Sequence, residues 1–186
     1  MADWDANMEM TSRELWTALH GMFFGGLFLI LFSGLIITLW GLDSESFTQL
    51  GIRRRLRVLR VCSCALALLA WFTVIAGTYV VYPWYRAKPP QGTTGSALMH
   101  YPRSLLLYRP QTADWHELGM EWKEHIAWLT PILATSAAVV LNAHGRRVSR
   151  DRQLRRTVLA FYSICFFCAV VAGVFGALIN KAAPIR

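Results

Sequence analysis

Charged residues are scarce in this sequence, at 16% of its 186 residues, whereas hydrophobic residues make up 55%. This composition is too apolar for an ordinary soluble domain and indicates an integral membrane protein. The four cysteines lack the spacing of a secreted disulfide scaffold, and we interpret them as small buried hydrophobic residues. The sequence also has no nucleophile–base constellation and no phosphate loop, which argues against a stand-alone enzyme.

A basic region of the kind that opens a signal peptide is also missing. The first ten residues, MADWDANMEM, are acidic, and the apolar run that follows is too long for the hydrophobic region of a secretory signal. We therefore expect no cleaved signal peptide, and we interpret the first apolar run as a membrane span.

Four apolar runs are each close to the roughly 20 residues that cross a bilayer core. They lie at about residues 15–40, 61–82, 122–142 and 158–178. The predicted fold is therefore all-α: a single membrane domain over residues 1–186, built as a bundle of four transmembrane helices with one long loop at residues 83–121. Pro131 is expected to kink the third helix.

The net charge of +8 is concentrated in two blocks, RRRLRVLR at Arg53–Arg60 and RRVSRDRQLRR at Arg146–Arg156. Each block falls in a connection between apolar runs, at residues 41–60 and 143–157. The positive-inside rule places such connections in the cytoplasm. Both termini and the long loop are then expected on the non-cytoplasmic side of an inner (plasma) membrane. The blocks favour contact with anionic lipids rather than nucleic acid.

Two local patterns refine this layout. TSRE (Thr11–Glu14) fits a capping box and DWHE (Asp114–Glu117) is a looser version, so the first and third helices are expected to begin before the membrane. The long loop opens with YPWYRAKPPQGTTGS, which is expected to be extended. ALMHYPRSLLLYRP follows, and we expect it to form a short apolar patch on the surface, against a partner subunit.

Two histidines interrupt the apolar helices, His20 in the first and His125 in the third. Along their helices His20 is roughly 30 Å from Trp40, and His125 is roughly 28 Å from His144. Since the two helices run in the same direction, both rings are expected at a similar depth near the outer surface. Ionisable groups in a membrane are functional by default, although an interfacial histidine can also be a plain amphipathic residue.

Two imidazoles at one depth of a four-helix bundle suit the two axial positions of one haem b, with His20 and His125 as the iron ligands. Gly21 and Gly25 have small-xxx-small spacing beside His20, which permits close helix contact or leaves room for a flat macrocycle. Arg86 and Arg103 of the long loop are expected near the haem propionates.

A second metal site uses the same histidine. Glu117, Glu121 and His125 are spaced i, i+4, i+8 and are expected on one helix face, where with His20 they could bind a non-haem metal at the outer surface. The simpler interpretation of this face is the wet side of an amphipathic helix. The sequence leaves open the roles of three further histidines: His100, His116 and His144.

The layout of four spans, with His20 and His125 at one end of spans 1 and 3, resembles small membrane cytochrome b subunits, such as the haem-bearing anchors of quinone-linked respiratory complexes. The resemblance implies an electron-transfer subunit of a membrane respiratory or photosynthetic complex. It would exchange electrons between quinone and an outer-face partner, and it would pack against other membrane subunits. A function of another class stays open, that of a redox-silent accessory subunit of a larger membrane complex.

Overall fold

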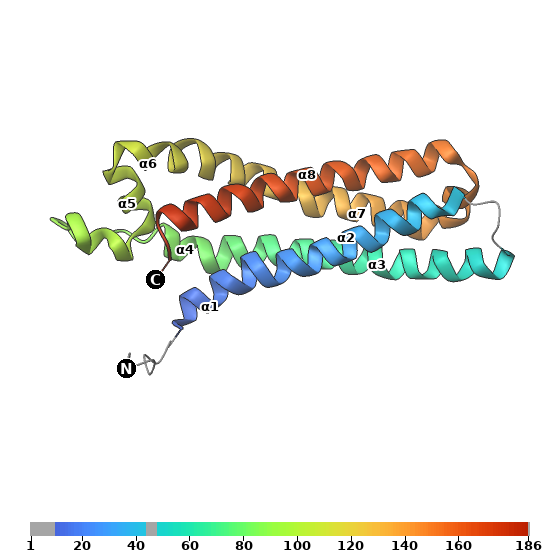
Figure 1. Ribbon diagram of the computed structural model, residues 1–186, viewed down its shortest axis with the longest axis horizontal. Coiled ribbons are helices and arrows are strands. Elements are labelled where there is room, and N and C mark those ends of the chain that lie inside the picture. Colours follow the sequence, from blue (N-terminus) through green and yellow to red (C-terminus); the bar gives the residue numbers. More distant parts are fainter. Residues whose placement is uncertain (1–9, 44–47, 186) are drawn as a thin grey trace, which may run out of the picture.

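The computed structural model describes residues 10–43 and 48–185. Most of the acidic N-terminal segment and part of the first basic connection lie outside these residues. Four helices are long and apolar enough to cross a membrane: Ser12–Trp40, Leu50–Tyr85, Pro110–Arg150 and Arg152–Ala182. They confirm the predicted all-α fold and the four helices of membrane-spanning length and composition, and they lie lengthwise beside one another (Figure 1).

Two long helices, each with a π-helical turn, form the first half of the bundle. In chain order its elements are α1 (Ser12–Ala18), the π turn η1 (Leu19–Phe23), α2 (Phe24–Trp40), the 3₁₀ turn η2 (Gly41–Asp43), α3 (Gln49–Ala76), the π turn η3 (Gly77–Val81) and α4 (Tyr82–Tyr85). The predicted capping box is confirmed at the start of α1. The Thr11 hydroxyl accepts from the Glu14 amide at 3.2 Å, and the Glu14 carboxylate accepts from the Thr11 amide at 2.9 Å.

The second half begins with short elements and ends with two long helices. In chain order they are the 3₁₀ turn η4 (Gly95–His100), α5 (Pro102–Tyr108), α6 (Pro110–Asp114), the π turn η5 (Trp115–Met120), α7 (Glu121–Arg150) and α8 (Arg152–Ala182). Residues 87–94 precede them without a regular element. Gly92 and Gly95 there have positive φ angles of 83° and 60°, a conformation that favours glycine.

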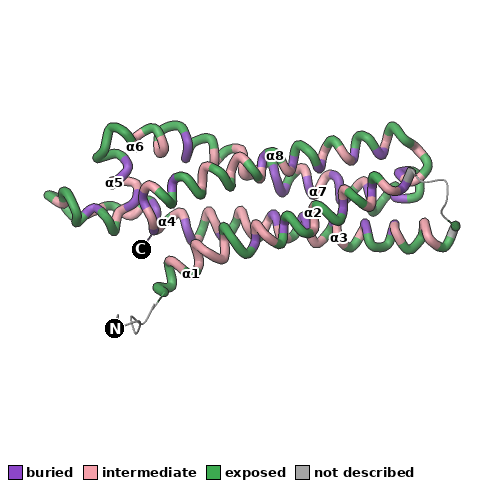
Figure 2. Tube along the Cα trace, viewed as in Figure 1, coloured by how far each residue is buried: buried purple, intermediate pink, exposed green. Residues whose placement is uncertain are grey.

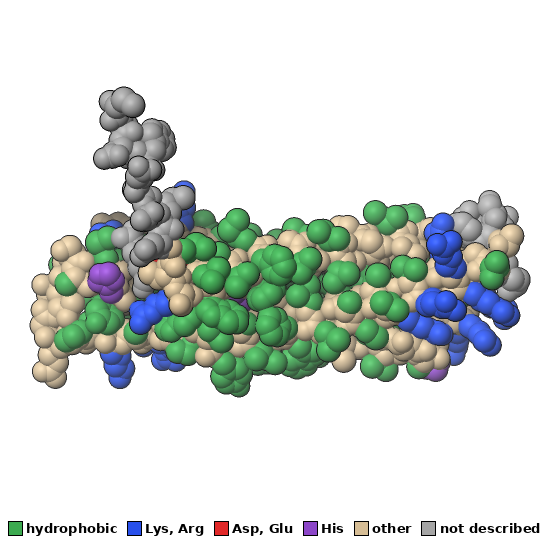
Figure 3. Space-filling view, turned by 90° about the horizontal axis from the view of Figure 1, so that it is seen from below, with side chains coloured by type: hydrophobic (Ala, Val, Ile, Leu, Met, Phe, Trp, Pro, Cys, Tyr) green, Lys and Arg blue, Asp and Glu red, His purple; other side chains and the backbone are tan. Residues whose placement is uncertain are grey.

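The two ends of the bundle differ in chemistry. We call one the loop end; it holds the start of α1, residues 82–121 and the end of α8 (Figure 1). We call the other the basic end; it holds residues 48–60 and 143–157, and Lys and Arg side chains gather there (Figure 3). On the face seen in Figure 3, hydrophobic side chains are spread over the stretch between the ends and no Lys or Arg side chain is seen in its middle, as a lipid-facing belt requires.

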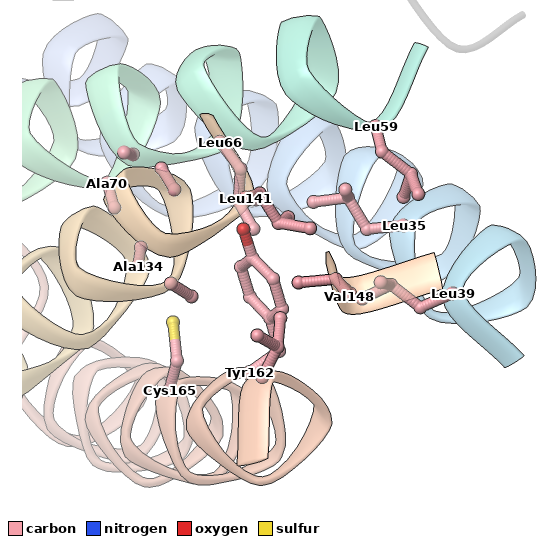
Figure 4. Packing of buried hydrophobic residues seen from close by; sticks show 14 of the residues in the cluster. Leu35, Leu39, Leu59, Leu66, Ala70, Ala134, Leu141, Val148, Tyr162 and Cys165 are labelled. Atoms are coloured by element: carbon pink, nitrogen blue, oxygen red, sulfur yellow. The ribbon is translucent and has the colours of Figure 1, made fainter. Parts of the chain in front are cut away.

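The main core lies on the inner faces of the four long helices (Figure 2). Figure 4 shows the ring of Tyr162 reaching from α8 toward Leu66 and Leu141. Four of the core's leucines and valines complete this packing: Leu35, Leu39, Leu59 and Val148. Close packing of this kind drives the association of helices in a membrane, because lipid tails are as apolar as leucine and burial of apolar side chains gains little there.

The cysteines only partly follow the sequence interpretation. Cys165 and Cys168 are buried in α8, as predicted for small hydrophobic residues. Cys62 is partly buried and packs against the core, whereas Cys64 is exposed, so the interpretation is wrong for Cys64. Both lie in α3, whose spacing turns Cys64 toward the surface beside Asn142, the amide of which donates to its sulfur at 3.3 Å.

A second core closes the loop end. Leu105 and Leu106 of α5 are buried there, together with Tyr85, Met120 and Ile179. The predicted apolar surface patch is therefore wrong for these two leucines, because the loop folds back against the end of α8. The neighbouring Leu107 and Tyr108 are exposed.

Candidate functional site

His20 lies in the π turn η1 and faces the second long helix. Its ring rests on Gly77: a Cβ added to Gly77 would be 2.6 Å from Cε1 and 3.0 Å from Nε2 of the imidazole. The ring also interacts with the backbone of Thr73. Its Nδ1 atom is buried and has no hydrogen-bond partner within the protein. Buried polar atoms are rarely left in this state, so His20 is a candidate functional group.

His125 has different surroundings, on the exposed side of α7. Its Nδ1 atom is 2.7 Å from the carbonyl oxygen of Glu121, four residues earlier in the same helix. Trp122, Leu129 and Ile132 share this side and are exposed as well, so His125 points where lipid or a partner would lie.

The structure does not bring His20 and His125 face to face. Gly119 lies against Phe175 of α8, where an added Cβ would be 3.2 Å from the ring, and Lys123 crosses Gly176 on the same helix. These contacts fix the rotation of α7 and turn the side that carries His125 away from the bundle. The two glycines predicted at the haem site, Gly21 and Gly25, have open space around them, since an added Cβ meets nothing within 4 Å.

His116, whose role the sequence left open, joins three elements of the loop end. Its Nε2 atom accepts a hydrogen bond from Nε of Arg103 at 3.1 Å, and its Nδ1 atom is 2.8 Å from the hydroxyl of Tyr85. Arginine can only donate, so Nε2 must carry a lone pair and the ring proton lies on Nδ1. The ring is therefore neutral and donates to Tyr85, which keeps its own hydroxyl proton for another acceptor.

Tyr82, three residues before Tyr85, extends this arrangement. Nη1 of Arg86 donates to its hydroxyl at 3.2 Å, and the guanidinium lies 5.4 Å from the centre of its ring. The Glu124 carboxylate interacts with the same hydroxyl. Oε1 of Glu124 is buried without a hydrogen-bond partner within the protein. Arg86 and Arg103, which the sequence predicts beside haem propionates, contact Tyr82 and His116.

Lys123 connects this group to His20. Its stem crosses Gly176 of α8, where an added Cβ would be 3.0 Å from Cε, so a glycine is what admits the side chain to the bundle. The ammonium group is close enough to His20 and to Glu124 to interact with both electrostatically. The ammonium groups of lysines usually extend to water on their flexible side chains, whereas the Lys123 side chain is half-buried between helices.

These side chains form one arrangement, which we call the polar chain. It consists of His20, Tyr82, Tyr85, Arg86, Arg103, His116, Lys123 and Glu124. The three π turns within residues 10–43 and 48–185 lie beside it: η1 contains His20, η3 contains Gly77 and precedes Tyr82, and η5 contains His116. Single π turns inside α-helices are frequent at functional sites.

The residues of the predicted carboxylate–histidine site lie on the surface. Glu117, Glu121 and His125 are all exposed, as the wet or lipid-facing side of a helix would be. The π turn η5 also ends between the two glutamates, so their i, i+4 phase is not that of a regular α-helix. Over residues 10–43 and 48–185, no group of three His, Cys, Asp or Glu side chains is placed to hold a metal ion.

The remaining two histidines lie apart from the polar chain. His100 is exposed at the end of η4, and His144 lines a hollow at the basic end. A smaller hollow of about 190 Å³ at the loop end is lined by Met99, Leu105, Arg109, Ala182 and Pro184. No family model, no curated protein and no solved structure matches the chain.

Proposed function

We propose that the protein is an integral membrane subunit of a larger respiratory or photosynthetic complex, and that the polar chain carries protons between the loop-end surface and the interior of the bundle. The observation that carries this proposal is the unpartnered Nδ1 of His20 at the inner end of a series of interacting ionisable groups. Such groups are costly in a membrane and mark proton or ion pathways.

The distribution of charge supports an orientation for this pathway. The Arg-rich connections lie together at the basic end, which the positive-inside rule assigns to the cytoplasm. The loop end, with His116 and Arg103, then faces the non-cytoplasmic side of an inner membrane. Protons would enter or leave the polar chain from that side.

Several groups of the polar chain have a defined part in such transfer. Arg103 holds His116 neutral with its Nδ1–H on Tyr85, so His116 orients the Tyr85 hydroxyl without itself passing on a proton, and the Tyr85 proton stays available. Glu124 and Lys123 can each take up and release a proton, and they lie between Tyr82 and His20. The buried Nδ1 of His20 is the inner terminus, where a proton would pass to a partner subunit.

A flux measurement with a matched pair of variants tests the proposal. We would reconstitute the complex that contains the full chain in liposomes with a pH-sensitive dye inside and drive proton entry with a potassium diffusion potential, because the partner subunit must take the proton onward from His20. Glu124→Gln removes a titratable group at nearly constant shape and should lower flux at least about tenfold. Glu117→Gln makes the same charge change at an exposed site of η5 and should leave flux unchanged. Wild-type flux equal to that of protein-free liposomes would overturn the proposal.

A second candidate, haem b electron transfer with quinone as the electron partner, is favoured by one observation. The Nδ1 of His125 hydrogen bonds to a backbone carbonyl, which leaves Nε2 as the outward-facing nitrogen. Metal-ligating histidines commonly have this arrangement. Because His125 faces away from the bundle, it would serve at an interface with another subunit, where a haem would supply the one-electron chemistry.

Colour distinguishes the candidates. A haem-bearing complex should show a reducible absorption band that His125→Ala abolishes, whereas His100→Ala, a change at another exposed histidine, should leave it intact. A colourless complex with proton flux supports the first proposal alone. A colourless complex without flux supports the redox-silent accessory subunit.

A further inference from the structure

The basic end carries a hollow that the polar chain does not use. It has a volume of about 410 Å³ and is lined by Arg60, Ala143, His144, Arg146 and Arg147. Arg60 comes from α3 and the other four residues from α7, so the hollow lies between two membrane-spanning helices. Three guanidinium groups at one hollow indicate an anionic ligand.

Arg60 is held in place by the backbone of α7. Its Nε donates to the carbonyl oxygen of Leu141 at 3.3 Å. Its guanidinium lies against Gly145, where an added Cβ would be 3.1 Å from Nη2 and 3.2 Å from Nε. Positive φ angles among the described glycines occur only at Gly92 and Gly95. The absence of a side chain at Gly145 therefore serves contact with Arg60 and not backbone conformation.

The helix α7 is interrupted at the same place. His144 has φ −121° and ψ 21°, the non-helical conformation inside an otherwise continuous helix. Arg147 pairs with Asp151 at 3.4 Å, which offsets one of the three positive charges. The hollow therefore keeps a positive balance, and Arg60 is the arginine whose side chain is hydrogen bonded to the backbone of α7.

We propose that this hollow binds the phosphate group of an anionic lipid headgroup. Arginine recognises phosphate through paired N–H donors, and basic pockets between transmembrane helices on the cytoplasmic side suit such headgroups. Leu141, which anchors Arg60, lies near the end of the apolar part of α7, so the hollow is at headgroup depth. The inference is independent of proton transfer at the other end.

A pair of variants that leave the net charge unchanged tests this binding geometry. Gly145→Ala adds a Cβ where the Arg60 guanidinium lies, whereas Gly173→Ala adds one in open space on α8. We would measure retention of dioleoyl phosphatidylglycerol by native mass spectrometry of the full chain from mixed phosphatidylglycerol–phosphatidylcholine nanodiscs. The wild type and Gly173→Ala should retain the anionic lipid alike, and Gly145→Ala should bind it about tenfold more weakly.

Two further measurements complete the test. If Gly145→Ala does not fold, we would compare lipid retention by Arg60→Gln and Arg57→Gln. Arg57 belongs to the same arginine block but is exposed, so only Arg60→Gln should weaken retention. Titration of the protein in phosphatidylcholine nanodiscs with inorganic phosphate distinguishes a lipid headgroup from free phosphate as the ligand. Saturable phosphate binding without selective retention of the anionic lipid would overturn the lipid and assign free phosphate as the ligand. Equal lipid retention by every variant would overturn the site and leave only general surface attraction.

Discussion

His20 and Gly77 are in direct contact across the first two long helices, with no space for a side chain between them. We expect Gly77→Ala to destabilise the protein by about 1–3 kcal/mol, because the added methyl group must displace the ring. Unfolding in a denaturing detergent series would measure this loss. Gly25→Ala, which adds a methyl group in open space, should change stability by less than about 0.5 kcal/mol.

The double variant His20→Ala, Gly77→Ala shows whether the ring causes this loss. Without the imidazole the new methyl group has room, so the two changes should not add, and the coupling should be at least about 0.5 kcal/mol. Strict additivity would mean that alanine at position 77 harms the π turn itself.

The hydrogen bond between His116 and Tyr85 yields a second expectation. Tyr85→Phe removes the acceptor of the Nδ1 proton of His116 in a buried place and should cost about 1 kcal/mol. Tyr79→Phe, on the same long helix but exposed, is the matched control and should be nearly neutral. Nitrogen-15 spectra of His116 should show the Nδ1–H tautomer in the wild type. A protonated Nε2 would contradict the assigned roles.

Trp71 and Thr135 connect α3 to α7 in the apolar middle of the bundle. Nε1 of Trp71 donates to the Thr135 hydroxyl at 3.0 Å, and that hydroxyl donates to the carbonyl of Pro131 at 2.7 Å. Thr135→Val leaves the indole without its acceptor and should cost about 0.5–2 kcal/mol. Ser136→Ala, which removes a hydroxyl that bonds only within α7, is the control. Equal effects of the two changes would rule out the interhelical bond as the cause.

Asp151 makes the stability of the α7–α8 hairpin depend on pH. The amides of Leu154 and Gln153 donate to its carboxylate at 3.1 and 3.0 Å, and the first of these contributes most to lowering the pKa of Asp151. A carboxyl group whose pKa is lowered by folding stabilises the protein at pH values above its ordinary pKa of about 3.9. That contribution is lost as pH falls through the folded value.

Thermal unfolding between pH 7 and pH 3 measures this dependence. The wild type should lose more stability below about pH 4 than Asp151→Asn, which keeps a capping side chain but no charge. Asp114→Asn is the comparison, since Asp114 makes no capping hydrogen bond. Parallel curves for the wild type and Asp151→Asn would contradict the role of the charge.

Hydropathy predicts the four helices because apolar runs of this length match the thickness of the bilayer core when they are helical. It does not predict how each helix is rotated. The rotation of α7 depends on Gly119 and Lys123 meeting α8, which is a property of two helices together. The expected facing of His20 and His125 rested on depth alone, and depth is the same on every side of a helix.

The π turns explain a second difference between sequence and structure. Spacings of i, i+4 and i+8 assume 3.6 residues per turn, and η5 breaks that period before Glu121. His116 could have been suspected from its polar neighbours in DWHE, but its partners Arg103 and Tyr85 belong to other elements. Burial of Leu105 and Leu106 likewise depends on the end of α8, which local sequence does not show.

The exposed segment around Gly92 also has a practical consequence. It separates two pairs of long helices, each with its own arginine block toward the basic end and each with two helices long and apolar enough to cross a bilayer. Opening the backbone there would cut no helix. The molecule should therefore reassemble from two separately synthesised chains, which gives access to segmental isotope labelling of either half.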